Sequence, residues 1–345
     1  MRMVEPWVWI AIPALVACGK GADGPVLTAN DDGGIDAGPV ADGAPDAYAL
    51  PDAGTRTDGG LPTPALLWSA GPRENSGNMV ADATRLYWVS GGGGVPESLM
   101  AMNKDGTGLT TLTTHTPPMF VNVESLAIDS TSLYWAIGRG GPVAKINLDG
   151  SGLKQLATTD VNDDPRGIAL DATSIYWTGG TVTVKRLNKD GTGRPVVVSH
   201  TGRSDIAVDT TQIYTSSPLS RSNLDGTGLT PIGGESGGQH LVVDATAIYW
   251  CSLAGGLMQT MKSDWSTALL SFGCGGGAPL ALDGTSVYWA DDTGAINAVN
   301  KDGTRPRRIA LAMSDATRQA IVVDDASVYW IEGSGSGGWI ESAPK

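Results

Sequence analysis

The sequence predicts an all-β protein, a seven-bladed β-propeller with four antiparallel strands in each blade. A phrase close to Asp-x-Thr-x-x-Tyr-Trp recurs seven times, at intervals of 35–47 residues, and contains seven of the eight tyrosines; the fourth copy ends in Thr215 and the seventh has Ala326 at the Thr position. A period near 40 residues is typical of propellers, in which each copy forms one four-stranded blade. An Asp-Gly pair, a common signal of a tight hairpin, follows five of the copies. The copies are Asp82–Trp88, Asp129–Trp135, Asp171–Trp177, Asp209–Thr215, Asp244–Trp250, Asp283–Trp289 and Asp324–Trp330.

Residues 1–17 have the pattern of a bacterial lipoprotein signal peptide. Arg2 precedes an apolar stretch over residues 7–17, which is too short to span a bilayer as a helix. The stretch ends in L-V-A-C, which resembles the lipobox and implies lipidation of Cys18. Gly19 in place of Asp implies the outer membrane of a Gram-negative bacterium. The alternative is a short buried strand that ends in a chance cysteine.

Residues 18–63, which begin with the lipidated Cys18, are expected to form a disordered tether. From residue 19 on, this segment holds eight Asp against Lys20 and Arg56, and most of the rest is Gly, Ala and Pro. Too little apolar surface is present to offset the entropy of ordering. A flexible chain of this length spans about 35–40 Å root-mean-square. A calcium site is the alternative, but the D-x-D-x-D-G spacing of calcium loops is missing.

The net charge of −13 at pH 7 bears on the expected partners. An acidic surface repels phosphate, so we expect neither nucleic acid nor anionic lipid headgroups to bind it. Contact with the membrane is expected through the N-terminal lipid, and we expect a monomer.

The third copy illustrates the expected blade, within a propeller that covers residues 64–345. An apolar run leads to Asp171, Asp-Ala-Thr turns the chain, and a strand rich in aromatic and β-branched residues follows. The later Asn188–Gly191 sequence is expected to be a hairpin turn, because each copy supplies too few oxygens for a metal loop. The four strands are expected at residues 167–170, 175–178, 181–187 and 195–199.

Small residues stand two positions before each Asp, which suits inner strands that crowd around a propeller axis. The Tyr-Trp pair is then expected to fill the space between neighbouring blades, burying about 150–250 Å² per ring. The fourth copy has Tyr214-Thr215, so we expect the loosest packing there. The small residues are Val80, Ala127, Ala169, Ala207, Val242, Ala281 and Val322.

The last copy lacks a fourth strand, and the start of the propeller has one to spare. The last copy supplies strands at residues 319–323, 328–332 and 338–342, and the spare strand is Ala65–Ser69. We expect Ala65–Ser69 to complete the seventh blade and close the ring, because closure removes exposed strand edges.

The run I-A-L-D-x-x-x-I-Y-W-T with a later K-D-G resembles the YWTD repeat of low-density-lipoprotein-receptor-type propellers, over residues 79–332. The resemblance implies an antiparallel propeller in which Asp ends the first strand and Tyr-Trp lies in the second. The final Asp of YWTD is kept at Asp291, with Glu332 as a near match, and the receptor domains have six blades where seven copies occur here. The signal and tether look more like those of bacterial surface lipoproteins of unknown function.

The residues four or five positions before each Asp are expected to surround the mouth of the central channel, where propellers commonly bind ligands. The three histidines, His115, His200 and His240, are expected on this same face. Polar loops at a surface are ordinary; the alternative is that His240 with Asp205 or Glu124 forms an acid–base pair or a metal site, as in propeller lyases and lactonases. No motif fixes a catalytic residue, metal site or cofactor. The mouth candidates are Asn78, Glu124, Arg166, Asp205, Gln239, His240 and Gln319.

Cys251 and Cys274 remain once Cys18 is lipidated, and they are candidates for a disulfide in an oxidising compartment. One strand is expected between them, which separates them by ~10 Å unless the loop after the fourth strand folds back. A bridge needs Cα atoms within about 7 Å. Two free thiols are the alternative.

Together these features favour a lipid-anchored envelope protein that binds a protein or a polysaccharide through its loop-rich rim. A lyase or hydrolase with its site at the channel mouth is one alternative, and a structural scaffold without a ligand is another.

Overall fold

The computed structural model describes residues 61–70, 76–92, 95–115, 123–138, 140–158, 165–179, 183–199, 205–216, 218–232, 237–311, 317–334 and 337–345. The predicted signal peptide, Cys18 and the tether up to residue 60 lie outside these ranges. None of the described residues form a helix long and apolar enough to cross a membrane.

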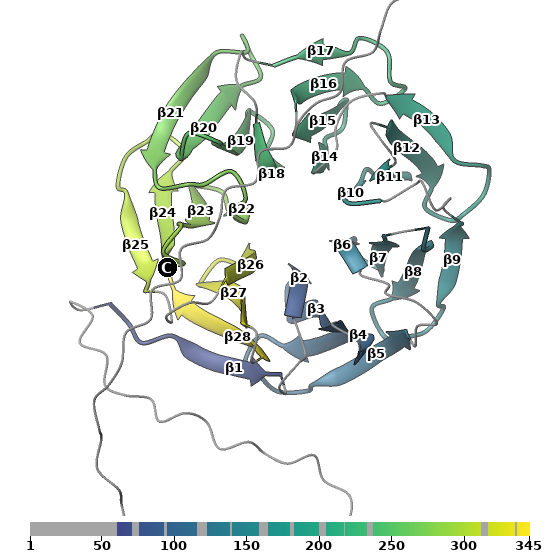
Figure 1. Cartoon of the computed structure of the whole chain (residues 1–345), viewed down its shortest axis with the longest axis horizontal. Helices are drawn as coiled ribbons and strands as arrows, with labels where there is room; N and C mark the ends of the chain where they lie inside the picture. Colours follow the sequence, from purple (N-terminus) through teal and green to yellow (C-terminus); the bar gives the residue numbers. More distant parts are fainter. Residues whose placement is uncertain are drawn as a thin grey trace, which may run out of the picture. The chain divides into compact units, whose positions relative to one another are not determined.

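The described residues form seven four-stranded antiparallel sheets, arranged as blades in a ring (Figure 1). This confirms the predicted seven-bladed propeller. Blades 1 to 3 are β2 (Ser76–Ala81), β3 (Arg85–Gly92), β4 (Val95–Asn103), β5 (Thr110–His115); β6 (Val123–Ile128), β7 (Ser132–Ile137), β8 (Val143–Asn147), β9 (Lys154–Ala157); and β10 (Ile168–Leu170), β11 (Ser174–Gly179), β12 (Thr183–Asn188), β13 (Val196–Ser199). Blades 4 to 6 are β14 (Ile206–Val208), β15 (Gln212–Ser216), β16 (Leu219–Asn223), β17 (Thr230–Pro231); β18 (Gly237–Val243), β19 (Ala247–Ser252), β20 (Gly256–Met261), β21 (Thr267–Phe272); and β22 (Leu280–Leu282), β23 (Ser286–Ala290), β24 (Ile296–Asn300), β25 (Arg307–Ala310).

Blade 7 is built from both ends of the propeller. It contains β26 (Thr317–Val323), β27 (Ser327–Ser334) and β28 (Gly337–Pro344), and β1 (Ala65–Ser69) adds the fourth strand beside β28. Trp68 pairs with Ile340 and Ser69 with Trp339. The predicted closure of the ring by the N-terminal strand is therefore confirmed.

The Asp of each repeat closes the first turn and also holds the Tyr of the second strand. In blade 3, Asp171 Oδ1 accepts hydrogen bonds from the amides of Thr173 and Ser174, both at 2.6 Å. Its Oδ2 accepts the hydroxyl hydrogen bond of Tyr176 at 2.7 Å. The same Tyr-to-Asp bond is present in all seven copies, at 2.7–3.2 Å. One carboxylate thus fixes both the turn and the strand that follows it.

A Tyr of one blade and a Trp of the next pack together in six of the seven seams, our term for the interfaces between neighbouring blades. Tyr87 of blade 1 and Trp135 of blade 2, for example, share one buried cluster. In the seam between blades 3 and 4, Tyr176 is present but Thr215 occupies the tryptophan position. The predicted packing of Tyr and Trp between neighbouring blades is therefore confirmed in six seams, and the seam between blades 3 and 4 lacks the tryptophan. The other pairs are Tyr134–Trp177, Tyr214–Trp250, Tyr249–Trp289, Tyr288–Trp330 and Tyr329–Trp88.

A lysine crosses five of the seven seams to the Asp of the preceding blade. Lys301 Nζ lies 2.8 Å from Asp244 Oδ2, and the two side chains are 19% and 18% exposed. Burial alone would raise the pKa of Asp324, but Lys104 and the backbone amides outweigh it and lower that pKa to about 2. Leu148 and Leu224 occupy the lysine position in the remaining seams. The five pairs are Lys104–Asp324, Lys189–Asp129, Lys262–Asp209, Lys301–Asp244 and Lys345–Asp283.

The recurring Asn-x-Asp-Gly-Thr sequence forms a hairpin turn, as expected. In blade 1, Asp105 Oδ1 accepts the Thr107 amide at 2.9 Å, Asn103 Nδ2 donates to the Thr107 hydroxyl at 3.0 Å, and Gly106 has φ of +84°. The side-chain oxygens are thus committed to the turn. In blade 5 the corresponding left-handed position holds Trp265, with φ of +61°.

Replacing Trp177 by Ala should lower the free energy of unfolding by ~3–5 kcal/mol, because the ring is 1% exposed and its removal leaves a cavity in the seam between blades 2 and 3. Urea unfolding followed by circular dichroism measures the loss. Val197→Ala in β13 of the same blade is the control, since Val197 is 44% exposed. Equal losses of unfolding free energy for the two variants would contradict the packing role of Trp177.

Candidate functional site

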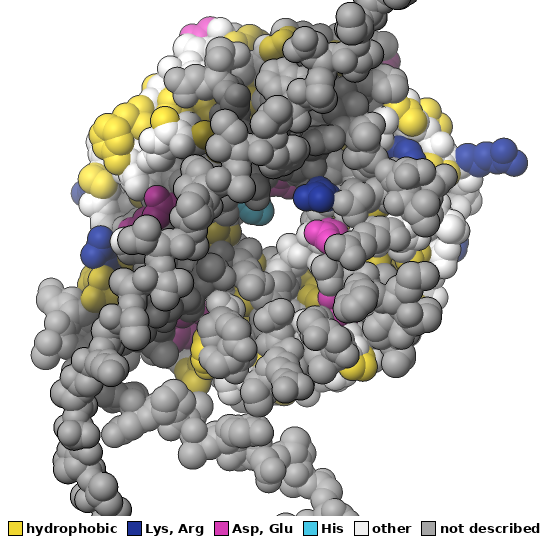
Figure 2. All heavy atoms as spheres, viewed as in Figure 1, with side chains coloured by type: hydrophobic (Ala, Val, Ile, Leu, Met, Phe, Trp, Pro, Cys, Tyr) yellow, Lys and Arg dark blue, Asp and Glu magenta, His cyan; other side chains and the backbone are white. Residues whose placement is uncertain are grey.

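The mouth of the central channel contains a cavity of about 130 Å³ to which six of the seven blades contribute. Its polar residues are Asn78, Asp205 and His240, and apolar residues of the inner strands, such as Leu126 and Leu280, make up the rest of its wall. On the face shown in Figure 2, acidic, basic and histidine side chains gather around the central opening. The cavity therefore combines an apolar wall with a few polar groups, the usual composition of a binding site.

Backbone irregularities place the mouth residues. The inner strands β2, β6, β18 and β26 each shift register at the predicted positions: next to Asn78, next to Glu124, before Leu241 and next to Gln319. A β-bulge adds a residue to one strand and re-aims side chains, and bulges are frequent beside functional sites. These irregularities occur at the channel end of strands that otherwise follow the repeat.

Asp205 and His240 come together from neighbouring blades. His240 Nδ1 lies 3.7 Å from Asp205 Oδ2, and the two side chains are 42% and 25% exposed. Burial alone would lower the pKa of His240, but the carboxylate of Asp205 outweighs it, so the pKa of His240 is raised. Asp205 also accepts the Leu241 amide at 3.1 Å and the Ile206 amide at 2.9 Å. The carboxylate therefore lies within ion-pair distance of the imidazole and also joins blade 4 to blade 5.

Asn78 likewise lines the cavity and joins two blades, blades 1 and 2. Its backbone adopts φ of +43°, uncommon for a residue other than glycine. Its side-chain amide donates to the carbonyls of Val123 and Glu124, at 3.2 and 3.0 Å. Two of the predicted mouth residues thus hold adjacent inner strands together while they line the cavity.

The other candidates are less closely associated with this cavity. Glu124 and Arg166 do not line it, and the Arg166 side chain is exposed. Gln239 and Gln319 lie in β18 and β26, but their side chains are outside the described part of the structure. His115 ends the outer strand β5, away from the channel, and His200 is not described. Of the predicted acid–base combinations, the structure brings together His240 with Asp205.

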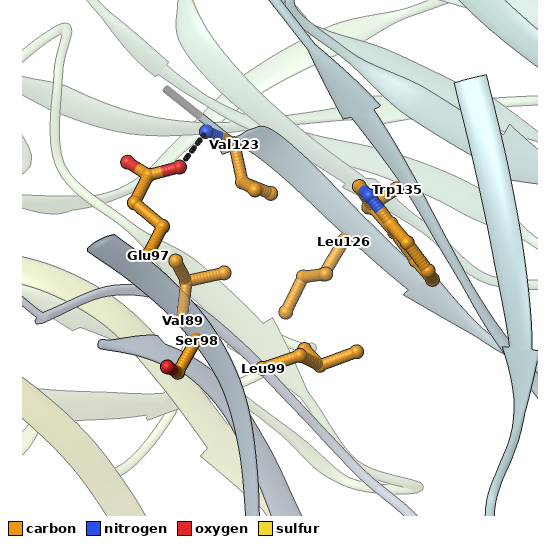
Figure 3. A pocket seen from close by; sticks show the side chains of 7 residues that line it. All are labelled: Val89, Glu97, Ser98, Leu99, Val123, Leu126 and Trp135. Atoms are coloured by element: carbon orange, nitrogen blue, oxygen red, sulfur yellow. Dashed lines mark hydrogen bonds between the residues drawn. The ribbon is translucent and has the colours of Figure 1, made fainter. Parts of the chain in front are cut away.

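A buried carboxylate that the sequence did not reveal lies between blades 1 and 2. Glu97 is 8% exposed and its Oε2 accepts the Val123 amide at 3.0 Å (Figure 3). Burial raises the pKa of Glu97, and the charge of Glu124 adds to the rise. The adjacent void of about 10 Å³, lined by residues such as Leu99 and Trp135, has room for one water at most. It is a packing defect in the seam and too small for a ligand.

Cys251 and Cys274 form a disulfide in blade 5, with Cα atoms 5.3 Å apart. The separation is shorter than the ~10 Å of an extended arrangement because the loop after β21 folds back. The carbonyl of Gly255 accepts the amides of Gly273 and Cys274, at 2.9 and 3.1 Å. Among the described residues, no three His, Cys, Asp or Glu side chains are placed to hold a metal ion.

No protein-family model and no curated protein matches the chain. The solved structures that resemble it include the extracellular domain of a protein assigned to a one-component system from B. thetaiotaomicron, at 16% identity and a TM-score of 0.60. That match covers 80% of this chain and 39% of the other. A chain from the crystal structure of a nidogen–laminin complex matches at 16% identity and a TM-score of 0.46, covering 59% of this chain and 85% of that one. At this identity the first likeness shows the fold.

Replacing Asp205 by Asn should lower the pKa of His240, because it removes the negative charge that raises it. With a raised pKa in the folded protein, the pair stabilises the fold below the ordinary histidine pKa near 6.5, and this stabilisation is lost as the pH rises through the folded-state value. Titration of the imidazole by NMR measures the shift. Asp225→Asn, in a turn of blade 4, is the control, and an unchanged or higher pKa in Asp205→Asn would contradict the pairing.

Proposed function

We propose that this protein is a lipid-anchored binding protein of the bacterial envelope, and that it holds a protein partner at the channel mouth. The observation that carries the proposal is the mouth cavity, where the Asp205–His240 pair adjoins an apolar wall. The sequence-based expectations of a lipid at Cys18 and a flexible tether support the placement in the envelope.

A protein partner fits the cavity better than a polysaccharide does. A volume of about 130 Å³ is comparable with one amino-acid side chain, so a partner would insert a single residue and lay its neighbours on the rim. Sugars are commonly held against the faces of Trp, Tyr or Phe, and none of these types is among the described residues that line this cavity. A single partner side chain that inserts into a desolvated pocket commonly supplies much of the affinity of a protein interface.

Binding also suits the chemistry of the mouth better than catalysis. Both carboxylate oxygens of Asp205 accept backbone amides, and the Asn78 amide is committed to carbonyls of blade 2. These polar groups keep the ring rigid. A lyase or hydrolase would use His240, beside Asp205, as its acid or base. This is the second candidate, because the two side chains lie 3.7 Å apart at the mouth.

An affinity pull-down from envelope extract tests the binding proposal. The tag belongs in the tether, because Lys345 at the C-terminus pairs with Asp283. His240→Ala should reduce the recovery of the partner at least about fivefold, as expected for the loss of ~1 kcal/mol at a mouth contact. Arg308→Ala, an exposed position on the outer strand β25, should leave recovery unchanged.

Three outcomes would contradict the proposal. Equal recovery by both variants would move the interface away from the mouth. Recovery of polysaccharide in place of protein would reverse the choice of partner. Recovery of neither would favour a scaffold without a ligand.

A further inference from the structure

The lysines that cross the seams show which groups bond the carboxylate of the repeat Asp in this ring. In the seam between blades 4 and 5, Asp209 Oδ2 accepts the Tyr214 hydroxyl at 2.8 Å and the Lys262 ammonium at 2.7 Å. Asp244 Oδ2 receives Tyr249 and Lys301 in the same way, at 3.2 and 2.8 Å. Oδ2 is thus built to accept two donors, one from its own blade and an ammonium from the next.

The seam between blades 3 and 4 keeps the carboxylate but has no lysine to meet it. Asp171 Oδ2 accepts the Tyr176 hydroxyl at 2.7 Å, and Leu224 occupies the lysine position of blade 4. Among the described residues no Lys or Arg forms a salt bridge with Asp171 within 4.0 Å. The second acceptor position of Oδ2 is therefore open in this seam.

A groove of about 540 Å³ lies at this open position. Its walls carry the carboxylates of Asp171 and Asp209, and the apolar side chains of Leu170, Val208 and Leu224. The volume is within the range of ligand pockets. Because the groove lies at the turn that ends the inner strand, it is on the opposite face from the channel mouth, where the inner strands begin.

Arg186 lies nearby but does not occupy the open acceptor position at Asp171 Oδ2. Its guanidinium donates to the Leu224 carbonyl at 3.4 Å and lies near Tyr176. Blade 6 provides the precedent: Arg307 approaches the Tyr288 hydroxyl at 3.5 Å, and Lys345 still reaches Asp283. An arginine beside the Tyr and an ammonium at the Asp are therefore compatible in this ring.

We propose that the groove between blades 3 and 4 binds a lysine side chain of a partner protein. The ammonium takes the place at Asp171 Oδ2 that the chain's own lysines take in five other seams, while Asp209 across the groove is already paired with Lys262. The alkyl stem lies along Val208 and Leu224, since lysine stems cover apolar surface while the charge reaches a polar partner. This site is independent of the one proposed at the mouth.

The seam between blades 1 and 2 is a natural control, because Leu148 replaces the lysine there too. That seam retains its tryptophan, Trp135, and Leu148 packs against the buried cluster. The Arg85 guanidinium also lies 5.6 Å from the Tyr87 ring centre. The seam beside Asp82 therefore differs from the one beside Asp171 in retaining its tryptophan.

NMR titration of the full-length, ¹⁵N-labelled protein tests the proposal with an Ala-Ala-Lys-Ala-Ala peptide blocked at both termini, its Nε-acetylated form, n-pentylammonium and 1-pentanol. The lysine peptide and the amine should shift the amide signals of Thr173 and Ser174, which bond Asp171, whereas the acetylated peptide and the alcohol should not. Asp171→Asn should weaken peptide binding by about five- to tenfold, since an amide cannot replace the charge. Higher salt should weaken it too.

Leu224→Lys should abolish peptide binding, because the new lysine fills the position, and should raise Tm by about 1–3 °C. Leu148→Lys should leave peptide binding intact. The proposal fails if 1-pentanol or the acetylated peptide binds as well as its charged counterpart, if Leu224→Lys still binds, or if Asp171→Asn binds unchanged. If one of Leu224→Lys and Asp171→Asn does not fold, peptide binding by the other variant tests the proposal. Binding of the amine without the lysine peptide would overturn the assignment to a partner protein.

Discussion

The ring depends on one carboxylate, repeated seven times. Each repeat Asp uses Oδ1 to close the turn after the inner strand and Oδ2 to hold the Tyr of the next strand. In five seams the same Oδ2 also meets a lysine of the following blade. The pKa of every one of these carboxyls is lowered, so the folded ring prefers them charged. Turn, strand and seam are thereby fixed by a single group.

Departures from this repeat mark the places where function is proposed. At the channel mouth, bulges interrupt the inner strands and bring Asp205 and His240 together across a seam. On the other face, the seam between blades 3 and 4 has Leu224 in place of the lysine and Thr215 in place of the tryptophan, and a groove lies beside Asp171 there. The regular copies build the ring, and the irregular positions make its two faces different.

Much of the frame could be predicted from the sequence. The spacing of the Tyr-Trp phrase gives the blade count, the small residues before each Asp indicate the inner strands, and the spare strand at Ala65–Ser69 predicts the closure. The first two features are local and recur along the chain, and the spare strand is visible because the last copy lacks its fourth strand. Non-local contacts were missed: Lys262 and Asp209 are 53 residues apart and meet because neighbouring blades lie side by side.

The site was less predictable for the same reason. Sequence offsets from the Asp placed Asn78, Asp205 and His240 at the mouth, and the structure has them in one cavity. The bulges that aim them change no hydrophobic pattern, so the sequence gives no sign of them. The buried Glu97 and the fold-back of the loop before Cys274 likewise depend on backbone partners, Val123 and Gly255, that no side-chain pattern identifies.

A double-mutant cycle across one seam tests the central role of the carboxylate most directly. Asp244→Asn, Lys301→Met and the double variant are compared by urea unfolding, with Asp82→Asn and Leu148→Met as a matched cycle in a seam that has no lysine. If the carboxylate ties the blades together, Asp244 and Lys301 show a coupling energy of about 1 kcal/mol and the control pair shows none. Additive losses for Asp244 and Lys301 would contradict the account.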